Sequence, residues 1–207
     1  MSTINTLLKQ AALYSEKIPF SETLAEKSLS RSPLLHTKLD VISPGGQMDS
    51  QTAFLLKTSG QPLLIDEALI LSLNRLAGGS GAFRQNQKPA ETGGFSYPAP
   101  GEIPRLLEHL SSQIKYSSAV LSAPELAAMV FKRLADICPF EQGNLLTAEL
   151  LMNIVFIHFS YIPFFLPLSC EADYFEALSS SRRLKDMDIF SEFIVRCLLQ
   201  SYEALEP

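Results

Sequence analysis

Apolar side chains recur every three to four residues through most of this chain, which is the spacing of one face of an α-helix. Near the start, five residues follow this series: Ile4, Leu7, Leu8, Ala11 and Tyr14. Similar patterns predict further helices at about 22–29, 50–57, 66–78, 102–116, 122–137, 144–161, 170–183 and 188–205. The sequence therefore predicts an all-α protein.

Two stretches break this periodicity. Residues 30–60 are rich in serine, proline and glycine, and they predict irregular chain around one short helix. Residues 81–98 mix glycine, proline and glutamine with aromatic residues, which favours an irregular hairpin. We expect a helical extension over 1–60, a main domain over 61–207, and a small β-hairpin flap at about 85–97.

The segment 150–168 contains nineteen residues and no formal charge. A membrane-spanning helix needs about 20 mostly apolar residues in continuous helix, and Pro163 and Pro167 interrupt this segment. A helix that is apolar all round is also typical of the centre of a soluble bundle. We expect a buried central helix, and we rank a membrane span far below it.

Charge and cysteine content narrow the function classes. The chain has 17 basic and 22 acidic residues, and a net charge of −5 argues against nucleic-acid binding. Cys138, Cys170 and Cys197 are too widely spaced for a zinc motif and suggest reduced, intracellular thiols. Because the first residues lack an apolar signal region, we expect a cytoplasmic protein, with delivery as a secreted effector left open.

The segment 138–149 reads CPFEQGNLLTAE. It resembles the signature of the Fic (Fido) family, H-P-F-x-[D/E]-G-N-G-R-x-x-R. Four positions match the signature: Pro139, Phe140, Gly143 and Asn144. The positions of the family's base, metal-binding acid, second glycine and two arginines hold other residues: Cys138, Gln142, Leu145, Leu146 and Glu149.

The resemblance extends over about residues 60–200, through a G-x-[YF]-R segment at 81–84 and an aromatic, proline-rich helix entry at 97–104. It implies a Fic-type helical bundle around a central buried helix. It also implies a flap that aligns an extended target segment by strand addition. The residues of this chain that match the target-binding flap are Arg84, Phe95 and Tyr97.

The substitutions remove the chemistry that the signature implies. Cys138 lacks the reach of the histidine base, and Gln142 brings no charge to a cation, so we expect no metal site. Glu141 is either a displaced ligand or a solvated loop residue. Leu145 intrudes where glycine lets the backbone approach phosphate, while the change to Leu146 removes a cation. We also expect Glu149 to place a negative charge in the pocket.

The four retained residues have structural explanations. Pro139 and Phe140 can fix the turn and fill the core, Gly143 permits the bend, and Asn144 can cap the next helix. We therefore predict a Fic-fold protein that has lost nucleotidyl (AMP) transfer, needs no cofactor, and acts through protein binding or regulation. The flap is the candidate surface, and the apolar face of the helix at 3–17 is a candidate for self-association. The alternative is a divergent Fic-type transferase that binds ATP with Mg²⁺ weakly.

Overall fold

A computed structural model describes residues 3–30, 47–91 and 94–206. The side chains of 47–49 lie outside this description, as do residues 31–46 of the irregular stretch predicted at 30–60 and the flap residues 92–93. Its helices are α1 (Thr3–Lys17), α2 (Glu22–Leu29), α4 (Gln47–Lys57), α5 (Glu67–Leu76), α6 (Ile103–Ser117), α7 (Ala123–Ile137), α8 (Asn144–His158), α9 (Glu171–Leu184) and α10 (Met187–Glu203). Short 3₁₀ turns precede α6 and α9, at η1 (Pro100–Glu102) and η2 (Leu168–Cys170). The all-α prediction is confirmed.

Local sequence signals set several helix ends. The Asp66 carboxylate accepts the amide of Leu69 at 2.8 Å and begins α5. Gly78 follows this helix with φ of 83°, a conformation in which a side chain is unfavourable. At the start of α7, the Glu125 carboxylate accepts the Ser122 amide at 2.9 Å. These caps satisfy backbone groups that the helix itself leaves unpaired.

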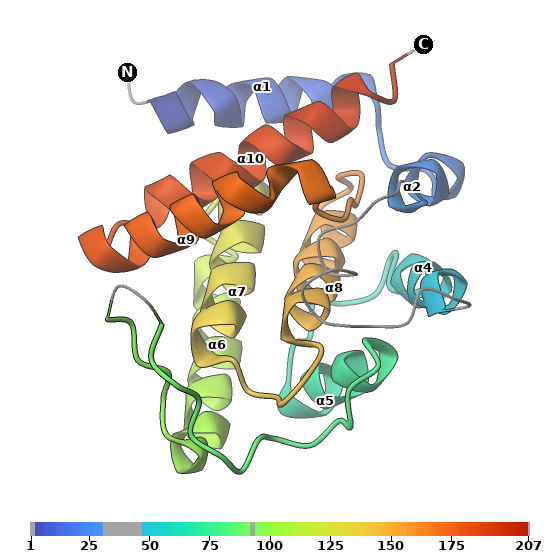
Figure 1. Ribbon diagram of the computed structural model, residues 1–207. Helices are drawn as coiled ribbons and strands as arrows, with labels where there is room; N and C mark the ends of the chain where they lie inside the picture. Colours follow the sequence, from blue (N-terminus) through green and yellow to red (C-terminus); the bar gives the residue numbers. More distant parts are fainter. Residues whose placement is uncertain (1–2, 31–46, 92–93, 207) are drawn as a thin grey trace.

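Helix α8 lies at the centre of the bundle. All residues from Leu145 to Ile157 are buried, so the prediction of a buried central helix is confirmed. Helix α7 lies beside α8, and α9 and α10 cross one end of this pair (Figure 1). Within the described residues, no helix combines the length and the apolar character needed to cross a bilayer.

Helix α1 covers α10. Ile4, Leu7 and Ala11 are buried, and the Tyr14 ring stacks on Tyr202 with 5.7 Å between centroids. The apolar face of α1 is therefore already occupied within the chain. This corrects the expectation that the face is exposed for self-association, and association through another surface stays a prediction.

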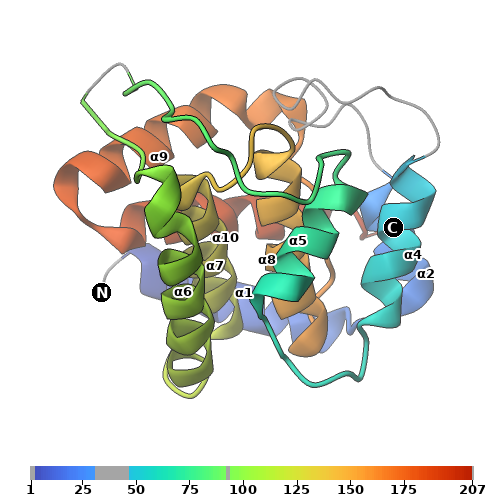
Figure 2. The same ribbon diagram turned by 90° about the horizontal axis from the view of Figure 1, so that it is seen from below.

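The predicted β-hairpin is not seen in the described part of the flap. The segment between α5 and α6 runs across the bundle as irregular chain (Figure 2). Two backbone hydrogen bonds close a turn within it, from Glu91 N to Phe95 O at 2.9 Å and from Gly94 N to Glu91 O at 3.0 Å. Pro89 and Pro98 have no amide hydrogen to donate, which limits a longer ladder. Side-chain contacts hold this segment instead.

Candidate functional site at the α7–α8 loop

The degenerate motif forms the loop between α7 and α8. Cys138 ends α7 in a left-handed conformation with φ of 47°, and Gly143 precedes α8 with φ of 76°. The Asn144 side chain closes the loop on itself: its Oδ1 accepts the Phe140 amide at 3.0 Å, and its Nδ2 donates to the Phe140 carbonyl at 2.8 Å. The expectation that Asn144 caps α8 is therefore wrong, because Gly143 occupies the cap position.

The other retained residues pack inside the protein. Phe140 is 1% exposed and lies 6.0 Å from Phe83 between ring centroids. A Cβ on Gly143 would lie 3.1 Å from the Asn74 Nδ2 atom and 3.2 Å from the Ala77 carbonyl oxygen. The Asn74 side chain and the backbone of Ala77, the residue after α5, thus approach the loop closely, and these contacts give Gly143 a structural reason to be glycine.

Asn74 of α5 holds the α7–α8 loop through hydrogen bonds of its side chain. The sequence analysis did not identify this residue. Its Nδ2 donates to the Gln142 carbonyl at 2.9 Å, and its Oδ1 accepts the Gly81 amide at 3.0 Å. The residue is fully buried. The available signal was a polar amide on the apolar face of α5, next to Leu73 and one turn after Ile70, since buried polar groups need partners.

Arg84 ties the flap to the loop. Its guanidinium donates to three backbone carbonyls, those of Cys138 at 2.9 Å, Asn86 at 2.9 Å and Pro98 at 2.6 Å. Its amide also donates to the Pro139 carbonyl at 2.9 Å. The side chain is 1% exposed. Arg84 therefore connects both ends of the flap to the motif loop from inside the protein.

A cavity of about 340 Å³ opens above the loop. The motif contributes Cys138, Glu141, Gln142, Gly143, Asn144 and Leu145 to its wall. The flap adds Lys88, Glu91 and Tyr97, while α7 and α9 add Ala135, Tyr174, Phe175, Leu178 and Arg182. The structure thus brings half of the predicted site residues together around one space, namely Tyr97, Cys138, Gln142, Gly143, Asn144 and Leu145.

The other predicted site residues do not line this cavity: Arg84, Phe95, Pro139, Phe140, Leu146 and Glu149. Leu146 is 1% exposed and packs in the core. Glu149 is fully buried, and its Oε1 accepts the Leu166 amide at 2.8 Å. The expectation that Glu149 places a negative charge in the pocket is therefore wrong, because this carboxylate binds the backbone that follows α8.

Cys138 is a poor proton acceptor in this setting. Burial raises the pKa of its thiol above the ordinary value, and the Lys88 ammonium beside it offsets this only in part. The thiol is therefore protonated at neutral pH. It cannot take a proton from an attacking hydroxyl as a neutral imidazole does.

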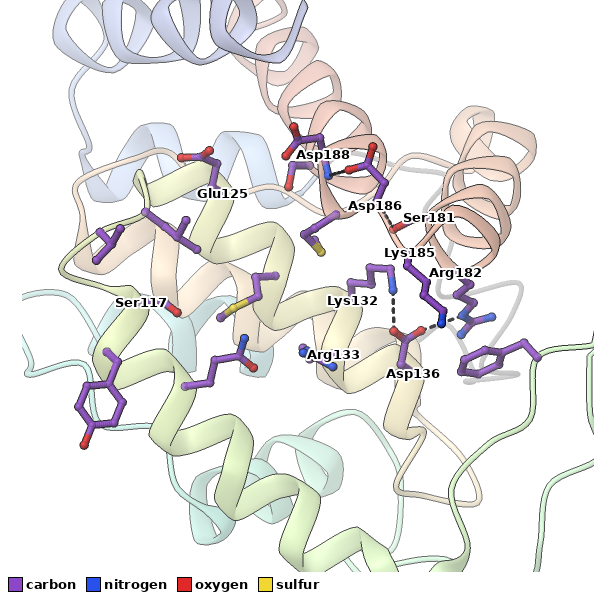
Figure 3. A pocket seen from close by; sticks show the side chains of 18 residues that line it. Ser117, Glu125, Lys132, Arg133, Asp136, Ser181, Arg182, Lys185, Asp186 and Asp188 are labelled. Carbon is purple, nitrogen blue, oxygen red and sulfur yellow. Dashed lines mark hydrogen bonds and ion pairs between the residues drawn. The ribbon is translucent and has the colours of Figure 1, made fainter. Parts of the chain in front are cut away.

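Arg182 is a cation of the cavity wall, but it is engaged within the protein. Its Nε donates to Asp136 at 2.7 Å, and its Nη1 donates to Glu91 at 2.5 Å. Lys132 also contacts Asp136, at 2.6 Å (Figure 3). The guanidinium carbon lies 3.8 Å from the centroid of the Phe95 ring. Burial alone would lower the pKa of Arg182, but these carboxylates hold it above the usual range.

Tyr97 completes this contact between flap and α9. Its hydroxyl donates to Glu91. Burial and this bond raise the pKa of Tyr97, so the phenol stays neutral. Phe95, the remaining predicted flap residue, packs edge-on against Tyr97 with 5.3 Å between centroids. The flap is thereby held against α9 by side chains.

A larger cavity, of about 740 Å³, lies beyond Arg182, between α6, α7 and the turn from α9 to α10 (Figure 3). Its wall carries four acidic and four basic side chains: Glu125, Asp136, Asp186 and Asp188 against Lys132, Arg133, Arg182 and Lys185. This balance of charge selects neither anions nor cations. No cluster of ligating side chains suited to a metal ion occurs in the described ranges.

Comparison with known proteins confirms the family resemblance. The model of the Fic/DOC family matches residues 64–156. A protein adenylyltransferase Fic of Aedes aegypti is 32% identical over 118 residues, which are 56% of this chain and 23% of that protein. The corresponding protein of Drosophila willistoni is 30% identical over 158 residues, 72% of this chain and 31% of that protein. The chain thus spans about a quarter to a third of these curated relatives.

Solved structures agree on the fold. A Fic domain-containing signalling protein of Bacteroides thetaiotaomicron superposes with a TM-score of 0.74 at 21% identity, covering 96% of each chain. Residues 134–508 of Fic-1 from C. elegans give 0.78 at 18% identity, covering 98% of this chain and 71% of that one. The chain is a Fic-family protein with a Fic-type all-α fold, identified through residues 64–156.

Proposed function

We propose that this Fic-family protein does not transfer nucleotides and acts by binding another protein. The observation that carries the proposal is the wall of the 340 Å³ cavity. It presents a buried, protonated Cys138 and the side chain of Leu145 at the positions where the family signature has a base and a glycine.

Phosphate binding at a helix start depends on close approach to backbone amides, on the helix dipole and on nearby cations. At the start of α8, the Leu145 side chain faces the cavity and hinders that approach. Leu146 and Glu149, at the signature's arginine positions, are buried elsewhere. The cations of the wall are Lys88 and Arg182, and Arg182 is paired with Asp136 and Glu91.

Calorimetric titration with ATP, ADP and CDP-choline, with and without Mg²⁺, tests the nucleotide part. We expect no heat of binding at millimolar ligand. The triple variant Cys138→His, Gln142→Asp, Leu145→Gly changes only cavity-facing residues and should gain measurable ATP binding. The matched variant Leu146→Arg, Glu149→Arg changes residues that face the core and should not. Micromolar binding of ATP by the unchanged protein would overturn the proposal.

The flap offers the protein-binding surface. Gln85, Asn86, Gln87, Pro89 and Ala90 are exposed, whereas Lys88 is half-buried and lines the cavity. Arg84 and Arg182 hold the flap from inside, so its outer edge has a defined shape. An extended partner segment could then pair with main-chain groups, a mode that needs no catalytic residue.

A pair of variants separates main-chain pairing from side-chain contact. Gln85→Pro removes one amide donor, whereas Gln85→Ala keeps it. Once a partner is found by cross-linking from Asn86, the proline variant should lose most of its affinity and the alanine variant should keep it. Equal affinity of the two variants would rule out main-chain pairing at this position.

A divergent transferase is the second candidate, and the persistence of the cavity favours it. Glu141 and Gln142 line this space as oxygen donors, and Lys88 lies beside Cys138. Transfer of label from ATP to a protein hydroxyl, lost on Lys88→Ala, would support this candidate. Full activity of Cys138→Ala in the same assay would remove Cys138 from the mechanism.

A further inference from the structure

Two cysteines that are 27 positions apart meet inside the protein. The Cys197 thiol of α10 donates a hydrogen bond to the sulfur of Cys170, with 3.8 Å between the sulfurs. Both thiols are free, and their residues are 7% and 4% exposed for Cys170 and Cys197. A disulfide requires about 2.05 Å, so the sulfurs need to approach by about 1.8 Å.

Cys138 differs from this pair. It lies in the motif loop, and the charged groups that act on its thiol are Lys88, Arg84 and Arg182. Cys170, in contrast, lies at the end of η2 and at the cap position of α9, a helix of 14 residues. The positive end of a helix dipole stabilises a thiolate. The chain therefore carries one isolated thiol and one paired dithiol.

We propose that Cys170 and Cys197 form a reversible intramolecular disulfide when a small peroxide oxidises the protein. The Cys170 thiolate attacks one peroxide oxygen, so that an S–O bond forms, the O–O bond breaks and hydroxide leaves. The Cys197 thiol then attacks the sulfenic sulfur; the S–S bond forms, the S–O bond breaks and water leaves with the thiol proton. The two sulfurs lose the two electrons that the peroxide gains.

The direction of attack follows from the hydrogen bond. Donation from Cys197 lowers the pKa of Cys170 to about 7, and the same contact raises the pKa of Cys197. Near neutral pH, Cys170 therefore has a substantial thiolate fraction, and Cys197 keeps the proton that the second step releases. An attacking thiol with a pKa near the ambient pH reacts fastest in such exchange.

The disulfide would act on the wall of the cavity. Cys170 directly precedes α9, and Tyr174, Phe175, Leu178 and Arg182 of α9 line the 340 Å³ cavity. A bond to Cys197 would fix the start of α9 to α10. Because a cross-link restricts the unfolded chain, oxidation should raise the thermal midpoint by roughly 5 °C or more.

The test treats the purified full chain with hydrogen peroxide and then with maleimide under denaturing conditions. The oxidised chain should weigh about 2 Da less and take up two fewer labels than the three that the reduced chain accepts. Cleavage after glutamate places the three cysteines on separate peptides, 126–141, 150–171 and 193–203. The expected product joins the second peptide to the third, and dithiothreitol separates them.

Cys170→Ser and Cys197→Ser should each abolish this product, while the matched control Cys138→Ser should keep it. The mass and the peptide map of the wild-type protein test the proposal even if a variant folds poorly. A disulfide that includes Cys138, a bond between two chains, or oxidation of Cys170 to sulfinic acid without any bridge would each overturn the proposal. So would an unchanged mass and three labels after treatment.

Discussion

Arg84 and Arg182 are two buried arginines that hold the same flap by different kinds of contact. The guanidinium of Arg84 donates to the backbone carbonyls of Cys138, Asn86 and Pro98. That of Arg182 contacts the carboxylates of Asp136 and Glu91 and the ring of Phe95. Arg84 thus positions the flap backbone through hydrogen bonds to its carbonyls. Arg182 instead holds flap side chains against α9.

The two kinds of contact should differ in how much they contribute to the free energy of unfolding. A buried carbonyl left without a donor costs free energy, and the bond from Arg84 to the Cys138 carbonyl is buried. Asp136 keeps Lys132 as a partner at 2.6 Å if Arg182 is lost, and the Glu91 side chain is 37% exposed and can turn to water. Among the described residues, the buried Nη2 of Arg182 finds no hydrogen-bond partner. We therefore expect Arg84 to control stability and Arg182 to control flap opening.

The largest effect is expected for Arg84→Ala. One buried and two part-buried carbonyls lose their donor, so the free energy of unfolding should fall by about 4 kcal/mol. Urea denaturation followed by circular dichroism measures this loss. Arg84→Lys can restore only some of these bonds, because an ammonium group lacks the planar fork of a guanidinium. Its free energy of unfolding should therefore lie between those of the wild type and of Arg84→Ala. A loss under about 1 kcal/mol for the alanine variant would contradict the assigned role.

Arg182→Ala should destabilise the protein less, by about 1–2 kcal/mol, because Asp136 and Glu91 retain other partners or solvent. Its main result should be faster amide hydrogen exchange in residues 85–91 with little change in α7 and α8. Arg183→Ala is the matched control, since Arg183 is the exposed neighbour. Uniform acceleration throughout the bundle would instead mean that Arg182 supports the whole fold.

Phe95→Leu isolates the contribution of the ring face beneath Arg182. The apolar volume is largely kept, while the cation–π attraction of about 0.5–1 kcal/mol is lost. Exchange in residues 85–91 should accelerate less than in Arg182→Ala. The same change in an Arg182→Ala background should add little if the two residues act on each other, and a double-mutant cycle measures that coupling.

Salt gives the smallest expected effect. At 1 M salt the Debye length is about 3 Å, which weakens partly exposed ion pairs such as Arg182 with Glu91. Exchange at residues 85–91 should rise slightly in wild type and stay unchanged in Arg182→Ala. The α7–α8 loop, held by Arg84 through carbonyls, should not respond. An equal response of both regions would remove the distinction between the two arginines.

Much of the fold could be predicted from patterns within short segments of the sequence. Helical periodicity predicted all the described helices, and the caps at Asp66 and Ser122 are local signals. The hairpin predicted for the flap is not seen in its described residues, whose course depends on Arg84 and Arg182, which reach the flap from inside the fold and from α9. Turn composition alone carries no information on such distant partners.

In the candidate site, too, some positions followed from the sequence and others depended on tertiary contacts. Cys138, Gln142 and Leu145, which the resemblance placed in one motif, line one cavity, and Tyr97 of the flap lines it as well. The resemblance misplaced Glu149, because correspondence with a signature position does not show where a different side chain will point. The carboxylate binds the Leu166 amide, a partner that exists only after the chain turns back beyond α8.

The sequence by itself determined the helices, the buried centre and the loss of the motif's charged groups, since these depend on residue type and on spacing within a few turns. Only the tertiary structure decided how those residues are used. It directs Leu145 into the cavity and Glu149 out of it, engages Arg182 with the flap, and brings Cys170 to Cys197. These outcomes depend on contacts between distant segments, which form only when burial of the shared core fixes the helices relative to one another.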